Sequence, residues 1–452
     1  NLSQKRDLKV FVRMPSNRLS DRDQEIFTLL LERKPHKNNQ VESVFWQKVL
    51  TPKEQPNANR IKSRLLAAIG NYISLYQLQE ETHFKNLLLA DFYTKKGAEK
   101  NAQAILNKGI ALAKKEEQMS HNNPLYLFWY HELKVERDKE RRVLDHKLEL
   151  MEGYLHDFFA LSRIRLLCEK ANRNRIINGH QDYERYRDEV ERLAQQSSAV
   201  HNQVYYWIFK LITEQQESYA ERLEQFLSKF HSRLGVVYRK EIYGHLMNFC
   251  IRRINAGQHL YADQYLRYIG KLEEQGELLD AGRLDVGTLK NAVLAALLMN
   301  KLDWALGFID RWADHLAHAS TIDKIAFLEL NRAIIELQNN NLEACFLHIT
   351  NFQTSAMYRK DVYYKITCDK LLLKLYYEVQ DIEPILNKIE STKGFIRKQE
   401  KLSVSRQQPH LTFLSLLHRI AKKKVINLQE VKAQLLIPDY LWLNKVIKED
   451  NP

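Results

Sequence analysis

Hydrophobic residues recur every three or four positions through most of this 452-residue chain, with polar residues between them. Between Asn59 and Gln79, for example, Ile61, Leu65 and Ile69 fall on one face of a helical pattern. This spacing matches the 3.6-residue period of an α-helix that buries one side. Val, Ile and Thr never alternate with polar residues in short runs bounded by turns, as they do in β-strands. The pattern therefore predicts an all-α fold.

The periodicity and the capping residues predict four parts of the chain. Ser20 and Asp23 resemble a capping box, in which two side chains satisfy free backbone N–H groups at a helix start. We expect an N-terminal helical domain over 1–80, helical hairpins with degenerate repeats over 81–200, clear repeats over 201–392 and a C-terminal helical cap over 393–452. The main helices are expected at 59–79, 84–93, 98–115, 144–177, 411–421, 428–436 and 440–447.

A sequence pattern recurs at intervals of about 40 residues in the second half of the chain. Its clearest copies surround Ala262, Ala305 and Cys345, and fainter copies surround Ala220 and Ile385. Each clear copy places a small residue at the same position, here called the shared slot, where two helices can approach closely. A fixed period in this range is typical of stacked helix pairs that bury one continuous core.

Small residues also occupy the position twelve residues before each clear slot, namely Cys250, Val293 and Ala333. With one small packing residue in each helix of a pair, the chain resembles the tetratricopeptide-like helical-repeat superfamily. The resemblance implies a right-handed α-solenoid of antiparallel helix pairs. The period of 40 to 43 residues exceeds the 34 of that family, and the family's Trp, Gly and Tyr signature and its closing Pro are absent.

A narrower resemblance covers most of residues 248–316. The segments Asn248-Phe-Cys-Ile-Arg-Arg253, Leu289-Lys-Asn-Ala-Val293 and Asp303-Trp-Ala305 are similar to a group of bacterial helical-repeat proteins of unknown function. This resemblance implies a bacterial cytoplasmic protein and indicates no chemistry.

Asparagine recurs fourteen positions before each clear slot, as Asn248, Asn291 and Asn331. Asn is a poor helix former, because its amide competes for backbone hydrogen bonds. In tetratricopeptide proteins that bind extended peptides, Asn at the corresponding place faces the groove. The resemblance therefore implies a peptide-binding ladder of these three residues, with Lys290 and Arg252 nearby to attract acidic groups. Alternatively, each Asn bonds to a neighbouring helix or to backbone inside the stack.

The helix expected at 59–79 also suggests an alternative function. It begins with Arg60, Lys62 and Arg64 and follows two shorter helices, so it resembles a helix-turn-helix whose last helix could enter a DNA groove. The other interpretation is a plain end cap. A second basic cluster, Arg163, Arg165, Lys170, Arg173 and Arg175, indicates either a solvated helix or a phosphate-facing strip.

Composition narrows the function further. The net charge of +13 comes from 69 basic and 56 acidic residues mixed along the chain, which is compatible with a solvated surface as well as with an acidic partner or nucleic acid. The four cysteines form no Cys-x-x-Cys pair, and the histidines show no metal-ligand spacing, so we expect reduced thiols and no metal. No nucleotide-binding glycine motif or nucleophile motif occurs, and no apolar run approaches a membrane span. We expect a non-enzymatic cytoplasmic scaffold without cofactors that binds a protein or peptide; the sequence does not indicate its oligomeric state.

Overall fold

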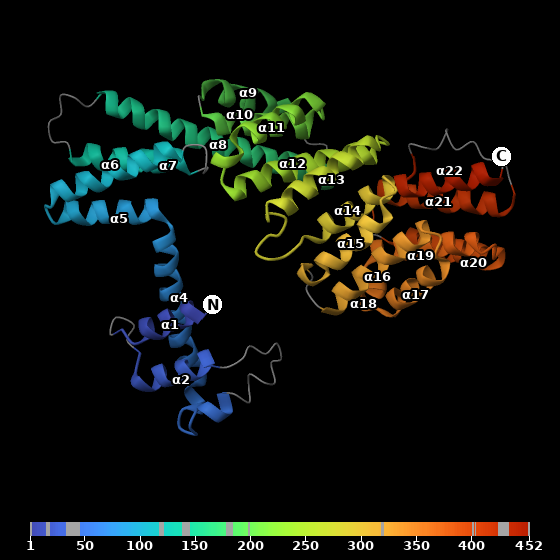
Figure 1. Cartoon of the computed structure of the whole chain (residues 1–452), viewed down its shortest axis with the longest axis horizontal. Helices are drawn as coiled ribbons and strands as arrows, with labels where there is room; N and C mark the ends of the chain where they lie inside the picture. The colour runs from blue at the N-terminus through green and yellow to red at the C-terminus, as the bar shows by residue number, and fades with distance from the viewer. Residues whose placement is uncertain are drawn as a thin grey trace. The chain divides into compact units, whose positions relative to one another are not determined.

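The computed structural model describes residues 2–14, 19–32, 46–116, 122–137, 145–177, 184–197, 199–317, 321–399, 402, 404–423 and 434–450. The described part of the chain is all-helical and contains no β-strand, which confirms the predicted fold class (Figure 1). Two isolated β-bridges, between Asp280 and Arg283 and between Leu284 and Leu316, stabilise the loop that precedes one helix. None of the described helices is long and apolar enough to cross a membrane.

The chain divides into two compact units, here called unit 1, residues 1–117 with 121–159, and unit 2, residues 118–120 with 160–452. The division falls inside one long helix, α8, and the domain boundaries expected at 80, 200 and 392 stay predictions. Unit 1 contains helices α1 (Leu2–Val12), α2 (Asp21–Glu32), α4 (Ala58–Glu80), α5 (Thr82–Lys95), α6 (Glu99–Lys115), α7 (Asn123–Arg137) and the first part of α8 (Asp145–Ile177).

Local sequence signals explain the helix boundaries in unit 1. The capping box before α2 is confirmed: the backbone N–H of Asp23 donates to Ser20 Oγ, and that of Ser20 donates to Asp23 Oδ2. Gly97 adopts a φ of 71° between α5 and α6, a left-handed turn that glycine makes without strain. The helices predicted at 59–79, 84–93, 98–115 and 144–177 are therefore present as α4, α5, α6 and α8.

Unit 1 has two small buried clusters. One joins α1, α2 and α4 through Val12, Phe27 and Leu65. The other joins α5, α6 and α7 around Tyr130, whose hydroxyl donates to the carbonyl of His83. Because Tyr130 fills the space above Gly109 in α6, no side chain fits at that glycine.

Unit 2 continues as a succession of helices in which each packs on its neighbours in the chain (Figure 1). Their bounds are α9 (Glu184–Gln196), α10 (Val200–Thr213), α11 (Glu217–Phe230), α12 (Val236–Asn255), α13 (Leu260–Glu274), α14 (Val286–Leu298), α15 (Leu302–Trp312), α16 (Thr321–Gln338), α17 (Leu342–Thr354), α18 (Ala356–Lys360), α19 (Val362–Glu378), α20 (Ile382–Arg397), α21 (Val404–Ala421) and α22 (Ile437–Asp450). The helix predicted at 428–436 lies mostly outside the described residues.

The sequence repeat corresponds to a repeated turn in the backbone. Five residues with a positive φ lie five positions before the shared-slot residues: Gln215, Gly257, Asn300, Asn340 and Gln380. In the last four turns, the N–H of the next residue bonds back to a carbonyl five positions earlier, as from Lys301 to Ala296 and from Asn341 to Glu336. This bond is the signature of a Schellman helix end. The same turn therefore closes the first helix of each pair.

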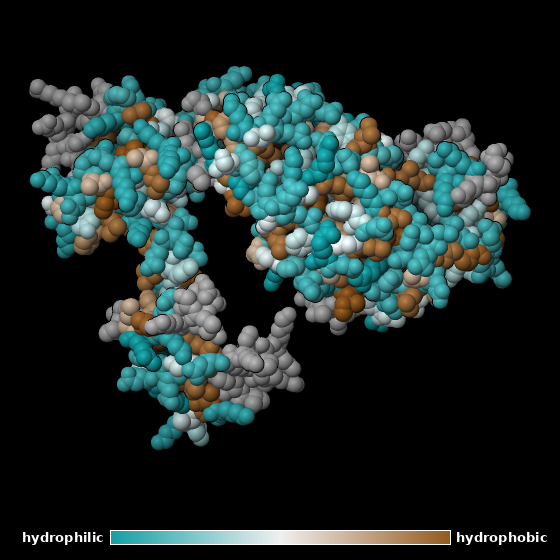
Figure 2. All heavy atoms as spheres, in the orientation of Figure 1, coloured by the Kyte–Doolittle hydropathy of each residue, from teal (hydrophilic) through white to brown (hydrophobic). Residues whose placement is uncertain are grey.

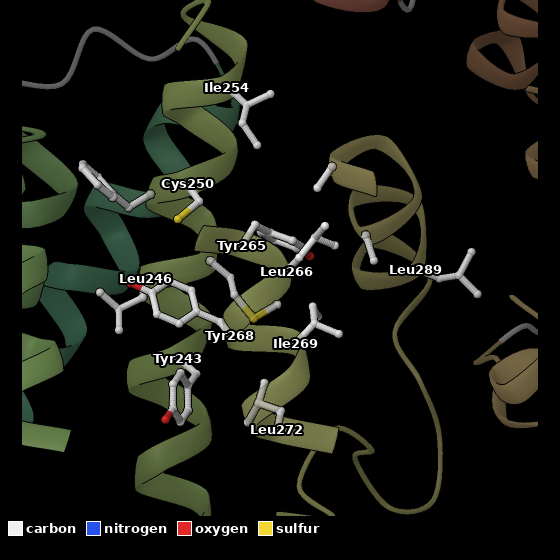
Figure 3. Packing of buried hydrophobic residues seen from close by; sticks show 14 of the residues in the cluster. Tyr243, Leu246, Cys250, Ile254, Tyr265, Leu266, Tyr268, Ile269, Leu272 and Leu289 are labelled. Atoms are coloured by element: carbon white, nitrogen blue, oxygen red, sulfur yellow. The ribbon is translucent and has the colours of Figure 1, made fainter. Parts of the chain in front are cut away.

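The shared slots are buried, as their small residues require. Ala262, Ala305 and Cys345 have no exposed surface, and Ala220 is 3 % exposed. Close to Ala262, residues of α12 and α13 interleave, with Cys250 and Leu246 facing Tyr265 and Tyr268 (Figure 3). A single cluster of buried residues includes members from the helices between α8 and α19.

Helix α22 packs on α19 through charged and aromatic side chains. The Asp439 carboxylate pairs with Lys370 and Lys374, and the indole of Trp442 donates to Glu378. Ile437 joins the cluster shared by the preceding helix pairs. Hydrophilic residues cover most of the visible surface of unit 2, with hydrophobic residues in scattered patches (Figure 2).

Candidate functional site

One face of α12 carries polar side chains that the core does not cover. Glu241, His245, Asn248 and Arg252, here called the α12 face, follow one another at helical spacings of four and three residues and all keep accessible surface. The side of this helix that carries Ile242, Leu246 and Cys250 is buried. The α12 face is therefore a polar strip that stays partly accessible while another side of the helix packs in the core.

Asn248 is the most accessible of the three predicted asparagines. It is exposed and makes no hydrogen bond with any residue in the described ranges. Its amide is free to offer one acceptor and two donors to another molecule. Arg252 is partly engaged, because its Nε donates to Gln215 Oε1 at 3.0 Å, at the turn of the preceding helix pair.

Asn291 and Lys290 lie on α14 and differ in their engagement. Asn291 is half-buried, and its side chain hydrogen-bonds to the phenol of Tyr265. The Lys290 side chain is exposed, yet desolvation lowers the pKa of its ammonium, and the Asp361 charge offsets this only in part.

Asn331 does not belong to an accessible ladder. Its side chain is only 4 % exposed, and Nδ2 donates to the carbonyl of Phe327 at 2.8 Å, one turn earlier in α16. This local bond satisfies the amide inside the stack, as the alternative interpretation of the asparagines describes. We therefore remove Asn331 from the candidate site and keep Asn248 and Arg252 on α12 and Asn291 and Lys290 on α14.

A cavity of about 300 Å³ adjoins the α12 face and was not anticipated from the sequence. It lies between α8 and α12 and is lined by Arg165, Leu166, Cys168, Glu169, Glu241 and His245. Glu241 accepts a hydrogen bond from the Tyr205 hydroxyl at 2.7 Å and pairs with Arg165 Nη2 at 3.3 Å. The Arg165–Glu241 pair fixes the wall of the cavity and neutralises its charge.

His245 lines this cavity and has a strongly lowered pKa. Burial lowers the pKa of His245 to about 4, and the nearby Glu241 carboxylate offsets only part of the shift. The imidazole is therefore neutral near pH 7, with one ring nitrogen as donor and the other as acceptor. Burial also raises the pKa of the Cys168 thiol well above its ordinary range, so this wall presents no thiolate. The cavity thus combines a neutral imidazole and a neutral thiol with the charged side chains of Arg165, Glu169 and Glu241.

The basic cluster predicted on α8 is largely paired with acidic side chains. Arg163 Nε lies 2.7 Å from Glu189, and Arg173 Nε lies 2.5 Å from Glu169. The ammonium of Lys170 is 5.9 Å from the centroid of the Tyr186 ring. The side chain of Arg175 lies outside the described residues. These pairings agree with a solvated helix more than with a phosphate-facing strip.

Two of the three residues of the helix-turn-helix alternative, Lys62 and Arg64, have partners inside unit 1. No side-chain partner for Arg60 is found within the described ranges. Arg64 Nη2 donates to the buried carboxylate of Asp23 at 2.7 Å, so it holds α2 against α4. The Lys62 ammonium lies 4.8 Å from the centroid of the Trp46 ring. Arg60 is exposed on the first turn of α4. Two of the three side chains thus have a structural role in unit 1.

No metal centre appears among the described residues, which bring no group of three potential ligand side chains together. All four cysteines are free and buried. Comparisons with protein-family models, curated proteins and solved structures give no match for this chain. The arguments for its function therefore come from the geometry of the chain alone.

Proposed function

We propose that unit 2 is a tetratricopeptide-like, right-handed α-solenoid of antiparallel helix pairs, and that it acts as a non-enzymatic scaffold that binds a protein segment. The repeated left-handed turn and the buried small residue that follows it support this architecture. The continuous core across successive pairs supports it as well. Solenoids of this kind present extended concave surfaces to their partners.

The observation that carries the binding proposal is the open α12 face. Four consecutive helical positions of α12 are polar and accessible there, and the first two, Glu241 and His245, also line a cavity of about 300 Å³. The Asn248 amide and the neutral His245 imidazole each combine donor and acceptor. This combination suits the main chain of an extended peptide, whose amides need both.

The charges around the site favour a peptide with an acidic side chain toward α14. Arg165 and Glu241 neutralise each other at the α8 side. At the other side, Lys290 has no ion pair with any of the described residues. A carboxylate that reaches Lys290 would replace lost solvation with a charge-assisted hydrogen bond.

Peptide selection on the purified full chain tests this proposal. Peptides are selected from a phage-displayed library, and the affinity of the best peptide is measured for wild type, Asn248→Ala and His245→Ala. Asn387→Ala is the matched control, because Asn387 is exposed on α20 and has no hydrogen bond within the described residues. We expect each variant of the α12 face to weaken binding about tenfold, as the loss of one good hydrogen bond would, and the control to bind like wild type. Equal binding by all four proteins would contradict the proposal.

No observation favours DNA binding as a second function, since Arg64 and Lys62 are engaged inside unit 1. A duplex-binding assay at low and high salt checks this, because phosphate contacts lose affinity steeply as salt rises. The cytoplasm remains our proposal for the location. It is supported by four buried thiols that form no disulfide.

A further inference from the structure

A second cavity lies where α19 begins and α20 ends, and it is distinct from the α12 face. Its volume is about 350 Å³. Its lining includes four cationic side chains, one carboxylate and one aromatic ring: Arg359, Lys360, Lys365, Lys398, Asp361 and Phe395. This volume is at the lower end of the range for pockets that bind small molecules.

Lys365 is a fixed cation in this cavity. Its ammonium donates to the Tyr358 hydroxyl at 2.8 Å and lies 4.0 Å from the centroid of that ring and 5.0 Å from the centroid of Phe395. The Tyr358 hydroxyl in turn donates to Asp369 Oδ1 at 2.9 Å. Because the ring contacts and this hydrogen-bond chain hold the ammonium in place, a ligand would pay little entropy to order it.

The buried carboxylate of Asp369 does not cancel the charge of Lys365. It lies 3.6 Å from Lys365 Nζ but only 2.7 Å from Lys388 Nζ, so two ammonium groups share one carboxylate. The pair of lysines therefore keeps a surplus of positive charge next to the cavity.

The rim of the cavity adds three cations without internal partners. Arg359, Lys360 and Lys398 are exposed, and none of their side chains forms an ion pair or hydrogen bond with another residue in the described ranges. The one acidic lining residue, Asp361, caps α19 by accepting the N–H groups of Tyr363 and Tyr364 at 2.9 and 3.1 Å. Its carboxylate still carries one negative charge, so four lining cations face one lining anion and positive charge is in excess.

We propose that this cavity binds a phosphate monoester, with Lys365 and Arg359 on the phosphate oxygens and Phe395 against the ester group. A dianion matches the excess of cations that line the cavity better than a single carboxylate does, and the planar guanidinium of Arg359 can bind two phosphate oxygens at once. The volume leaves room for more than the phosphate alone, and Phe395 supplies an apolar or stacking surface for the rest of the molecule. The proposal does not depend on peptide binding, since no residue of the α12 face lines this cavity.

Calorimetric titration of the full chain tests the proposal with three probes at constant ionic strength. Inorganic phosphate, a nucleoside monophosphate and a phosphoserine peptide share the phosphate group, so their order of affinity identifies the source of the ester. The test variant is Arg359→Gln with Lys398→Gln, which removes two exposed rim charges. The control is Arg283→Gln with Lys271→Gln, an equal charge change at two exposed cations that do not line the cavity.

We expect at least one ester to bind more tightly than inorganic phosphate, to lose at least about tenfold in affinity in the rim variant, and to keep its affinity in the control. Equal losses in both variants would indicate attraction to the net charge of the protein and would overturn the proposal. So would the absence of saturable binding by wild type up to about 10 mM of each probe, or unchanged affinity in the rim variant. The circular dichroism of each variant must match wild type, which the exposure of the substituted residues leads us to expect.

Discussion

Replacing Asp439 by Asn should loosen the attachment of α22 to α19. The carboxylate is 2 % exposed and lies 2.5 Å from Lys370 Nζ and 3.0 Å from Lys374 Nζ. Both lysines are themselves buried, at 6 % and 8 % exposure. The amide of Asn has nearly the shape of the carboxylate but no charge, so the substitution would leave two ammonium groups in the interior without a counter-ion.

The size of the effect follows from that uncompensated charge. Removing one partner of a buried ion pair costs about 3 to 5 kcal/mol of folding free energy. Two features of the site reduce this cost. The rings of Phe413 and Trp442 lie within 6 Å of the lysine ammonium groups, and desolvation already lowers the pKa of Lys370, so it can release its proton. We therefore expect a loss of roughly 3 kcal/mol, at the lower end of the range for a broken buried pair.

The pH dependence of stability gives a second test of the same ion pair. Desolvation alone would raise the pKa of Asp439, but the charges of Lys370 and Lys374 outweigh it and hold this pKa far below its ordinary value of 3.8. A group with a depressed folded pKa stabilises the protein above its unfolded pKa and loses that contribution as the pH falls further. The ion pair should thus contribute in full near neutrality and weaken only below about pH 4, and Asp439→Asn should remove this acid dependence.

Hydrogen exchange followed by mass spectrometry measures the effect where it acts, because α19 and α22 can open without global unfolding. Asp310→Asn is the matched control, since Asp310 forms an exposed pair with Arg332 in the same unit and its loss should cost less than about 1 kcal/mol. The reasoning fails if α19 and α22 exchange at the same rate in Asp439→Asn as in this control.

Three further predictions concern packing, acid stability and thiol reactivity. Gly109→Ala should destabilise unit 1 by about 1 to 3 kcal/mol although Ala favours helices, because the new Cβ would lie 2.3 Å from Tyr130 Cζ. The Cβ of Gly70→Ala meets nothing within 4 Å, so this control should stabilise unit 1 by up to about 1 kcal/mol. Urea unfolding of both variants measures the two changes in stability. The pKa of His245 falls from 6.5 to about 4 on folding, so the folded state binds fewer protons there than the unfolded state between these pH values. The free energy of unfolding should therefore decrease as the pH falls from 6.5 to about 4, and it should decrease less in His245→Gln. Urea unfolding across this pH range measures the difference. The buried cysteines should resist iodoacetamide until the chain unfolds, because burial raises their thiol pKa, to about 12 for Cys345; mass spectrometry of labelled peptides detects any native reaction.

Local signals were sufficient to predict the helices and the repeated turn. The helix expected at 144–177 is present as Asp145–Ile177, because a continuous 3.6-residue period extends over that stretch. The slot residues could be found because Ala262, Ala305 and Cys345 have the same packing environment in successive pairs. The sequence pattern recurs because the same backbone turn, followed five positions later by a buried residue, recurs in the structure.

The cavity beside the α12 face was missed because its parts are distant in the sequence. Arg165 and Glu241 are separated by 76 positions, and neither residue carries a local sign of the other. One signal was available, however. Glu241, His245, Asn248 and Arg252 form a polar stripe beside the apolar stripe of Ile242, Leu246 and Cys250, and this contrast marks the less covered face of α12. The pairing across α8 and α12 needs the tertiary structure.

The three asparagines show why periodicity alone does not locate a binding surface. Asn248, Asn291 and Asn331 occupy the same repeat position on α12, α14 and α16, yet they are exposed, half-buried and buried in that order. A repeat period fixes the side of the helix on which a residue lies, whereas accessibility depends on what covers that side. On α19, for example, Lys370 and Lys374 are buried because α22 contacts them through Asp439. A partner segment would therefore meet open polar groups on α12 and the start of α14, and our proposal places its binding there.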